Sequence, residues 1–494
     1  MGTDVQTKRF HKADFTLFSQ RLEENLELLG QLLERPGFGI GKSSLGAELE
    51  LTLIDSKGQA QWRNQQLLAL AKDPQLTLEL NRYNLEYNLS PVAAAGKPFS
   101  KIAAEINRKL KGIDKLGKPF DARSVAIGIL PTLGRRDISA TAMTDDNRYV
   151  ILSKAIKKLR HHALEVNIDG PEPLHLSVSN LNIEGANTSF QVHLRVNPAE
   201  FANLYNAAQL VTAPVLAIST NSPLFIGHRL WEETRVVLFK QSVETREQQG
   251  DHHIGPGRTG LGRSWVNSPL ELFEESVRDY PVFIPECKPG DDKKVMEQGG
   301  IPKLAELRMH HGSIWHWNRA IYDPADGGHL RIEMRALPSG PTTLDMCASA
   351  ALMVGLVKGL GAGMPKFTEQ LPFSEAKENL YRAAQLGLTA NFTWPRKTRA
   401  SAGEISAPKL LKKLLPIARE GLAELKVADS EIDQYIGIIE ARLAARQTGA
   451  RWQLAMLTAL EKHYSRKTAL HHLLDRYLEN VASGKPVHEW STSC

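Results

Sequence analysis

The stretch GAELELTL, residues 46–53, decides the fold of this chain. Glu48 and Glu50 alternate in it with Leu49 and Leu51, and side chains of a strand point alternately to its two faces. The stretch therefore predicts a strand with one apolar and one acidic face. Two carboxylates on one strand face lie about 7 Å apart at the backbone. Because like charges that close repel each other, a positive group is expected between them.

Three further stretches repeat this alternation: NLEYNL (84–89), FQVHLRV (190–196) and RIEMRA (331–336). The plain interpretation is an antiparallel sheet with one solvated face. Solvated faces usually carry threonine, lysine and serine, whereas these polar positions hold carboxylates, amides, a histidine and arginines. We therefore interpret the polar face as the floor of a reaction site.

The simplest positive group to place between Glu48 and Glu50 is a divalent cation. Further ligands for it are offered by Glu86, His193 and Glu333. Oxygen-rich sites favour Mg²⁺ or Mn²⁺ over zinc. Each residue also has a simpler interpretation. The two glutamates could be an exposed strand edge, and the histidine could be one member of a polar network.

Arg331 and Arg335 could be cross-strand partners of Glu48 and Glu50, with no metal ion at all. Carboxylates and arginines on one floor nevertheless fit metal–phosphate chemistry, in which cations bridge phosphate oxygens and arginines neutralise developing charge. The sequence contains no phosphate-binding loop of the Gly-x-x-x-x-Gly-Lys-Ser/Thr type. ATP would therefore bind through metal ions and scattered basic residues.

The composition is that of an ordinary globular protein: 494 residues, 42% hydrophobic, 23% charged, with a net charge of +6. This mild charge does not indicate nucleic acid as a partner. Three scattered cysteines argue for a reducing compartment. The N-terminus lacks the apolar core of a secretory signal, and the longest apolar stretch, 346–357, is too short to cross a bilayer. We expect a cytoplasmic protein without a membrane partner.

Hydrophobic spacing and capping residues predict helices over 14–34, 100–113, 197–221 and 342–358, and a buried strand over 125–130. A turn near residues 81–83 would reconcile the positions of Glu79 and Glu86. From about residue 374 the pattern is helical with no strand signal. We therefore divide the chain into a catalytic region, 1–373, and a helical C-terminal region packed on it, 374–494.

The irregular segment from 241 to 265 is rich in glycine and arginine. Loops of that length inside a compact domain are usually functional. We expect a mobile lid that orders over the substrate and excludes water.

Six motifs in order now resemble the glutamate–cysteine ligase type 2 family of carboxylate–amine ligases, part of the glutamine-synthetase-like superfamily. They are GAELELTLID, LEYNLSP, SFQVHL, LAISTNSPLFIG, PGRTGLG and HLRIEMRAL. The resemblance covers residues 45 to 400 or so. It implies an α+β fold in which an antiparallel sheet forms an active-site funnel with helices packed outside. It also implies ATP-dependent amide bond formation with two or three Mg²⁺ ions.

Carried over motif by motif, the resemblance implies a set of metal ligands, substrate contacts and nucleotide contacts. The metal ligands are Glu48, Glu50, Glu79, Glu86, His193 and Glu333. The substrate-binding residues are Arg258 and Gln191, and the nucleotide-binding residues are Arg335 and Arg331, with Arg335 also catalytic. Arg235, which lies outside the motifs, is a further predicted substrate-binding residue.

The leading hypothesis is a ligase that joins the γ-carboxylate of glutamate to the amine of cysteine through an acyl phosphate. A homodimer is one candidate for its assembly. One rival uses the same mechanism with a different amine. The other is a regulator that binds Mg-ATP without turnover.

Overall fold

The computed structural model describes residues 5, 7, 9–160, 163–246, 248–249, 252–253, 255–396 and 402–493. An eight-stranded sheet, curled into a half-barrel, forms its centre, with the main strand order β15-β16-β8-β1-β3-β2. All its pairings are antiparallel. Its strands are β1 (Ser44–Ile54), β2 (Leu76–Leu78), β3 (Asn84–Asn88), β4 (Val92–Ala93), β5 (Arg123–Val125), β8 (Phe190–Val196), β15 (Asn318–Asp323) and β16 (His329–Met334).

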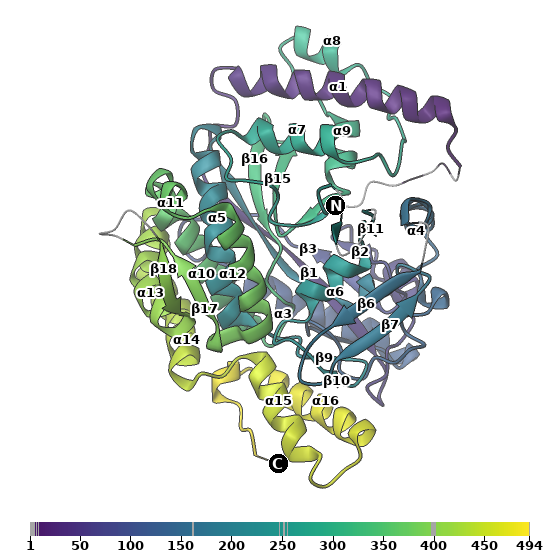
Figure 1. The fold of residues 1–494 in the computed structure, drawn as a ribbon, viewed down its shortest axis with the longest axis vertical. Coiled ribbons are helices and arrows are strands. Elements are labelled where there is room, and N and C mark those ends of the chain that lie inside the picture. Colours follow the sequence, from purple (N-terminus) through teal and green to yellow (C-terminus); the bar gives the residue numbers. More distant parts are fainter. Residues whose placement is uncertain are drawn as a thin grey trace.

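The apolar face of the sheet is fully buried against helices. Leu45, Leu49 and Leu51 on β1 are at most 1% exposed, and burying each such side chain contributes about 1.5–3 kcal/mol. Figure 1 shows the helices of this side on the left of the sheet. They are α5 (Pro198–Ser219), α10 (Thr343–Gly361), α12 (Phe373–Leu386), α13 (Ala407–Glu424) and α14 (Asp429–Ala445), with α11 (Met364–Gln370) beside them. The strong alternation of the sequence thus reflects one face packed on this helical layer.

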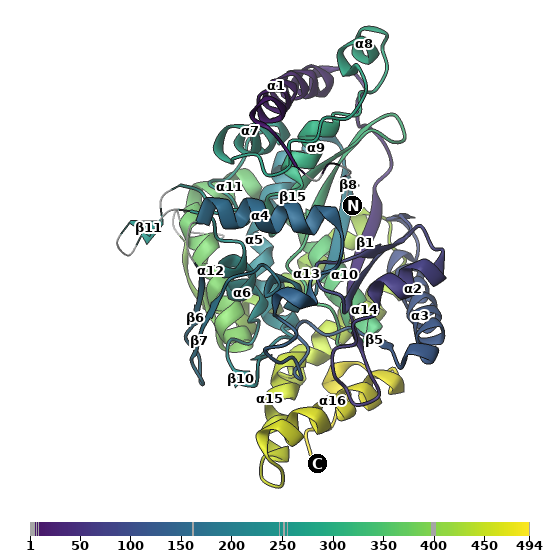
Figure 2. The same ribbon diagram turned by 90° about the vertical axis from the view of Figure 1, so that its right-hand side faces the viewer.

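The opposite, polar face of the sheet is covered as well. Here lie α4 (Asn147–Arg160), α6 (Arg235–Ser242) and the hairpin of β6 (Leu164–Ile168) and β7 (Leu174–Val178) (Figures 1 and 2). Helices α2 (Asn64–Ala71) and α3 (Pro98–Gly117) lie beside one edge of the sheet (Figure 2).

Helical layers close both ends of the molecule. At one end lie α1 (Lys12–Glu34), α7 (Pro269–Asp279), α8 (Asp292–Glu297) and α9 (Ala305–His311), and at the other lie α15 (Gly449–Leu460) and α16 (Arg466–Ser483) (Figure 1). The remaining short strands are β9 (Leu224–Phe225), β10 (His228–Arg229), β11 (Gln248–Gln249), β12 (His252–His253), β13 (Thr259–Gly260) and β14 (Trp315–His316). The expectation of an antiparallel sheet with helices packed outside is confirmed.

The predicted helices are confirmed as α1, α3, α5 and α10. Pro198 occupies the first turn of α5, where its missing N–H costs nothing. Thr342 caps α10, and its hydroxyl accepts from the backbone N–H of Asp345 at 3.1 Å. The predicted turn near residues 81–83 is present, because Asn84 N–H donates to the Asn81 carbonyl at 2.8 Å.

Two helices of the described chain, α5 and α10, are long and apolar enough to span a membrane by length and composition. Their most apolar windows are 89% and 83% buried inside the protein. Both form the layer behind the sheet, as core helices do.

Two expectations are wrong. The strand predicted over 125–130 ends at Val125 as β5, and the buried residues that follow are irregular. Gly128 there packs against Ser222 and the backbone of Asn221. The apolar run therefore indicated that these residues are buried, and they do not continue the strand. The region after residue 374 also contains strands. β17 (Asn391–Trp394) and β18 (Gly403–Ser406) pair with each other, and such four-residue strands are too short to give a periodic signal.

The C-terminal helices divide between two hydrophobic clusters. α13 and α14 contribute Leu411 and Ile436 to the cluster that contains the apolar face of the sheet. α15 and α16 contribute Trp452 and Leu473 to a second cluster beneath β6 and β7. The division into 1–373 and 374–494 stays a prediction.

Candidate active site

The strand registers bring the polar positions of four distant stretches onto one floor. Glu50 lies opposite Glu86 across β1 and β3, and Glu48 lies opposite Gln191 across β1 and β8. His193 lies opposite Glu333 across β8 and β16. The floor is not the solvated face of the plain interpretation, because Glu48, Glu86, His193 and Glu333 are only 6%, 6%, 4% and 1% exposed. It is a buried polar surface.

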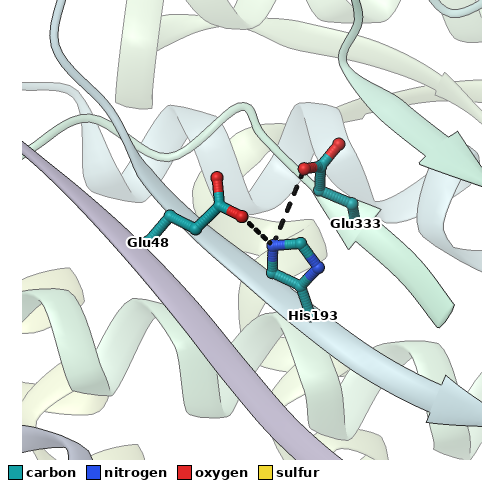
Figure 3. Close-up of side chains that lie close together, drawn as sticks. All are labelled: Glu48, His193 and Glu333. Atoms are coloured by element: carbon teal, nitrogen blue, oxygen red, sulfur yellow. Dashed lines mark ion pairs between the residues drawn. The ribbon is translucent and has the colours of Figure 1, made fainter. Parts of the chain in front are cut away.

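At one end of the floor, His193 lies between two carboxylates (Figure 3). Its Nε2 is 3.1 Å from Glu48 Oε1 and 3.6 Å from Glu333 Oε1. The three ligand atoms lie within 4.8 Å of one another, and neither ring nitrogen has a hydrogen-bond partner of acceptable geometry among the described residues. A buried imidazole nitrogen without a partner, facing two carboxylate oxygens, fits a divalent cation. We call this group the histidine end.

The carboxylates of the histidine end are electrostatically compensated. Burial by itself raises the pKa of Glu333, but the charges of Arg319, Arg335 and His193 hold that pKa well below its usual range. Burial likewise opposes ionisation of Glu48, yet nearby positive charge, to which His193 contributes, lowers the pKa of Glu48. Both side chains are therefore ready to act as anionic ligands.

At the other end of the floor, carboxylates gather without equal compensation. Burial raises the pKa of Glu50 to about 7 against the lowering effect of Arg335, and Glu184 adds to the rise. Burial, with the charges of Glu48 and Glu50, raises the pKa of Glu86 to about 7. Burial and the charges of Glu86 and Glu50 raise the pKa of Glu79 well above its usual range. We call Glu50, Glu79 and Glu86 the carboxylate end, which has the charge that cations neutralise.

Two arginines bind Glu333. Arg319 on β15 forks onto Glu333, with Nε 2.6 Å from Oε2 and Nη2 3.1 Å from Oε1. Arg335, just after β16, lies 3.4 Å from Glu333 Oε2 and donates through Nη1 to Gln191 Oε1. Gln191 in turn donates to Glu50 Oε1 at 3.0 Å. The amide therefore links the guanidinium of one end to the carboxylate of the other.

A cavity of about 320 Å³ lies over the floor. Six carboxylates and three arginines line it: Glu48, Glu50, Glu79, Glu86, Asp146, Glu184, Arg148, Arg319 and Arg335. The rest of its wall is mostly apolar and includes Trp315 from β14 and Leu152 from α4. The arrangement can hold cations and a phosphate chain on the floor while the walls exclude water.

Most of the predicted site residues lie in or behind this cavity. Glu48, Glu50, Glu79, Glu86, Gln191 and Arg335 line it, and His193 and Glu333 lie directly behind Glu48. Neither Arg331 nor Arg335 makes a described ion pair with Glu48 or Glu50. Arg331 instead lies 3.3 Å from Asp323 and is not part of the cavity wall.

The structure places Arg235 and Arg258 in scaffolding positions. Arg235 is 2% exposed and donates to Glu233 Oε1 at 2.6 Å and to the Ala336 carbonyl at 2.7 Å. Arg258 is 3% exposed, donates to Ser313 at 3.1 Å and stacks 3.6 Å from the Phe283 ring centre. Burial lowers its pKa to about 9. Neither arginine lines the cavity, and their predicted contacts with substrate stay predictions.

Three cavity residues were not found by sequence reasoning. Arg319 lies opposite Glu333 in the register of β15 and β16, and a hairpin pairing of these two stretches would have indicated it. Arg148 and Glu184 come from α4 and from the short 3₁₀ helix Glu184–Ala186. No local pattern marks either residue, because both reach the cavity only through the tertiary fold.

The predicted lid falls partly outside the described residues, since residues 247, 250, 251 and 254 are not described. On its described C-terminal side, β13 pairs in parallel with β14. Trp315 N–H donates to the Arg258 carbonyl at 2.7 Å, which ties this flank to the cavity wall. Closure of the segment over a substrate stays a prediction.

Comparison with known proteins decides the family. The sequence pattern of Glutamate-cysteine ligase family 2 (GCS2) matches residues 44–472, which contain every strand of the floor. The chain belongs to this family. The resemblance carried by the six motifs is thereby confirmed, and the protein is an enzyme of the glutamate–cysteine ligase type.

A solved glutamate–cysteine ligase shows the same fold at low sequence identity, and other solved structures are similar to a lesser degree. Glutamate–cysteine ligase (gshA) of Francisella tularensis, solved in complex with AMP, is 11% identical with a TM-score of 0.53, and the match covers 90% of each chain. A bifunctional glutathione synthetase of Pasteurella multocida matches 93% of this chain and 55% of its own, at 10% identity and a TM-score of 0.42. Glutamine synthetase of Plasmodium falciparum is 10% identical over 87% of this chain and 76% of its own, with a TM-score of 0.31. A search of curated protein sequences gave no match.

Family membership makes the protein an ATP-dependent carboxylate–amine ligase of the glutamate–cysteine ligase type. The buried floor and the cavity above it gather carboxylates, arginines and a histidine in one place.

Proposed function

We propose that this protein joins the γ-carboxylate of glutamate to an amine through an acyl phosphate, with cysteine as the first amine to test. The observation that carries the proposal is the convergence of six carboxylates and three arginines in one cavity, beside a buried histidine whose Nε2 faces the carboxylates of Glu48 and Glu333. A floor with this charge pattern suits a nucleoside triphosphate that is bound through cations.

The residues of both ends would hold Mg²⁺. Glu48, His193 and Glu333 would hold one ion, and Glu50, Glu79 and Glu86 would hold one or two more. Bound Mg²⁺ supplies Lewis-acid neutralisation of the phosphate oxygens. The carboxylate end supports this assignment, because its repelling charges are otherwise costly to bury.

Arg335 is the residue best placed to act on the transferred phosphoryl group. In the first step a carboxylate oxygen of glutamate attacks the γ-phosphorus of ATP, and the bond to the β–γ bridging oxygen breaks to release ADP. Arg335 lies between the two ends of the floor and can hold two equatorial oxygens in a fixed fork. Gln191 keeps its guanidinium oriented, and we retain Gln191 as a candidate substrate contact.

In the second step the amine attacks the carbonyl carbon of the acyl phosphate. A C–N bond forms as the C–O bond to phosphate breaks, and the nitrogen releases its proton. An acyl phosphate survives only where water is excluded, and the apolar wall around Trp315 and Leu152 serves that purpose.

Phosphate release from ATP with glutamate and a panel of amines tests the proposal, with the amide product identified by mass spectrometry. Hydroxylamine in place of the amine should yield the γ-hydroxamate of glutamate. Glutamate-independent phosphate release, or the α-hydroxamate as the sole product, would overturn the choice of the γ-carboxylate.

The two rival functions give different results in the same assay. An enzyme for another amine releases phosphate with that amine and not with cysteine. A regulator binds Mg-ATP, detected by calorimetry, and releases phosphate with no carboxylate–amine pair. A cytoplasmic location and a possible homodimer also stay predictions, which cell fractionation and light scattering check.

A further inference from the structure

The cavity has a cover that does not belong to the sheet. Helix α4 crosses the polar face (Figure 2), and the segment 181–186 lies beside it. Tyr149 Oη on α4 donates to the Leu78 carbonyl at 2.8 Å. Asn81 and Asn182 exchange two hydrogen bonds, of 2.8 and 2.9 Å. These bonds fix the cover against β2 and the turn that follows it.

The cover presents Arg148 and Glu184 to the cavity, and Asp146, directly before α4, also lines it. Among the described residues, the Arg148 guanidinium makes no ion pair or side-chain hydrogen bond, and it lies 6.0 Å from the centre of the Tyr149 ring. The Glu184 carboxylate likewise accepts no described hydrogen bond. The floor arginines differ, because both are bound to Glu333. Two half-buried charges without a described side-chain hydrogen bond or ion pair, both in the cavity wall, are available to a ligand.

Glu184 lines the same cavity as Arg335, Glu50 and Glu79. Burial raises its pKa to about 7, and the largest opposing effect comes from Arg335, followed by Arg148. Glu184 also raises the pKa of Glu50 and of Glu79. A carboxylate that shares the cavity with the floor acids is a poor partner for a phosphate and a good partner for a cationic group.

An apolar wall separates the cover charges from the main core. Tyr149, Leu80 and Leu181 belong to a small hydrophobic cluster of their own, with Leu152 and Trp315 packed against it. All five also line the cavity. Together these five side chains offer an apolar surface to a ligand in the cavity.

We propose that Glu184 and Arg148 form the amine-acceptor subsite, in which Glu184 binds the ammonium and Arg148 the carboxylate of an α-amino acid whose side chain lies on this apolar wall. The assignment rests on the proposed function. It deepens that function by making the acceptor an amino acid with an apolar side chain rather than a simple amine. A free α-carboxylate and an apolar side chain are required, and a thiol is not.

The physical reason is the match of three features to one zwitterion. A guanidinium forks onto a carboxylate in two parallel hydrogen bonds. A carboxylate accepts from an ammonium. Apolar side chains contribute free energy in proportion to the apolar area that they cover. A simple amine would use Glu184 alone and leave Arg148 unpaired in the cavity wall.

Two matched pairs of acceptors test the subsite. Leucine and isopentylamine differ only in the carboxylate, as do cysteine and cysteamine. For the wild-type enzyme we expect kcat/KM for leucine to exceed that for isopentylamine, and to equal or exceed that for cysteine. Arg148→Ala should raise KM for leucine and cysteine by roughly 10- to 100-fold, as for the loss of a charge-assisted contact. It should leave KM for both simple amines and for ATP unchanged.

Glu184→Gln should raise KM for all four acceptors, because all share the ammonium. Lys157→Ala, an exposed position on the same helix, is the matched control and should change nothing. Equal effects of Arg148→Ala on leucine and isopentylamine would overturn the subsite, as would a raised KM for ATP, which would make Arg148 a phosphate contact. Turnover of cysteine with none of leucine would overturn the apolar acceptor.

The failure of the proposed function has a different signature. In that case the wild-type enzyme releases no phosphate with glutamate and any of the four acceptors or hydroxylamine, and the subsite fails with it. Phosphate release with hydroxylamine, but an acceptor KM insensitive to both substitutions, would retain the ligase and reject the subsite.

Discussion

The two ends of the cavity floor are built from the same strands, yet their electrostatics are opposite. At the histidine end, Glu333 meets the charges of Arg319, Arg335 and His193, and its pKa lies well below its usual range. At the carboxylate end, the charges of neighbouring acids add to burial and raise the pKa of Glu86 to about 7. The histidine end is compensated by the protein itself, whereas the carboxylate end requires cations to become fully charged.

This difference indicates a division of labour. A site whose charges are balanced by fixed protein groups can keep its ligands oriented without a cation. Groups that bind metal ligands from behind have this orienting role. An uncompensated cluster gains most from cations and should respond most to their concentration. The predictions below follow from this contrast.

The largest effect is expected at Glu48, which belongs to the histidine end and also lines the cavity. Glu48→Gln keeps the shape of the side chain and removes a ligand charge that both ends feel. Turnover should fall by roughly 10³-fold or more, since metal-based charge stabilisation contributes several kcal/mol. Steady-state kinetics across a Mg²⁺ titration measure this. Glu420→Gln, at an exposed position on α13, is the control. Wild-type turnover of the Glu48 variant would remove the metal assignment.

The second effect is on the arginine between the ends. Arg335→Lys replaces a fork by a single flexible charge, so kcat should fall by roughly 10²-fold with little change in Mn²⁺ affinity. Arg331→Lys is the matched control, because Arg331 precedes Arg335 by four residues and lies near Asp323. If the Arg331 variant loses as much activity as the Arg335 variant, the predicted nucleotide contact of Arg331 is supported and the special role of Arg335 is not.

A smaller effect is expected from Arg319→Lys, which tests the compensation of the histidine end. The lysine retains the charge but cannot bind both oxygens of Glu333 at once, so Glu333 loses its fixed orientation. Mn²⁺ affinity should weaken by roughly 10-fold, as for other residues that orient metal ligands. Calorimetric titration with Mn²⁺ measures the change. Unaltered affinity would show that Glu333 is oriented without Arg319.

The smallest effect is on thermal stability, and here the substitution is expected to stabilise the protein. The raised pKa of Glu86 means that its ionisation in the metal-free protein costs folding free energy above the pKa of the unfolded state, and the cost is complete above pH 7 or so. Glu86→Gln removes about 1–3 kcal/mol of this cost. Tm at pH 8 without metal should therefore rise by about 1–3 °C. The gain should shrink toward pH 5, where Glu86 is protonated in the folded protein.

Added Mg²⁺ should reverse the order of the two proteins in this experiment. It stabilises the wild type by binding to the folded state, and the Glu86 variant less. A variant that is less stable than the wild type at pH 8 without metal would show that Glu86 is compensated by groups other than cations.

Sequence reasoning found the strands of the floor because their alternation is local, and a strand's two faces are fixed by the chain itself. It failed for residues 126–130 and for β17 and β18, where burial and short length leave no periodic signal. Among the site residues, the floor members were marked by alternation. Arg319 depends on a hairpin register, and Arg148 and Glu184 depend on how the cover docks.

Two arginines show the limit most clearly. Arg258 lies in one of the six motifs, and Arg235 lies outside them; both are buried in hydrogen bonds to carbonyl oxygens, a hydroxyl or a neighbouring glutamate. The sequence around an arginine does not show whether its side chain contacts a ligand or stabilises a loop. Only the coordinates of the surrounding donors and acceptors separate the two.

The sequence by itself determined the strand faces, the family and the identity of the floor carboxylates, because side-chain alternation and motif order are properties of the chain read along its length. The tertiary structure alone decided which charges compensate each other and what covers them. The pairing of β16 with β8 and β15 sets His193 and Arg319 against Glu333, and the docking of α4 brings Arg148 over the floor. Electrostatic energy depends on distance and burial in space, and neither can be read from positions along the chain.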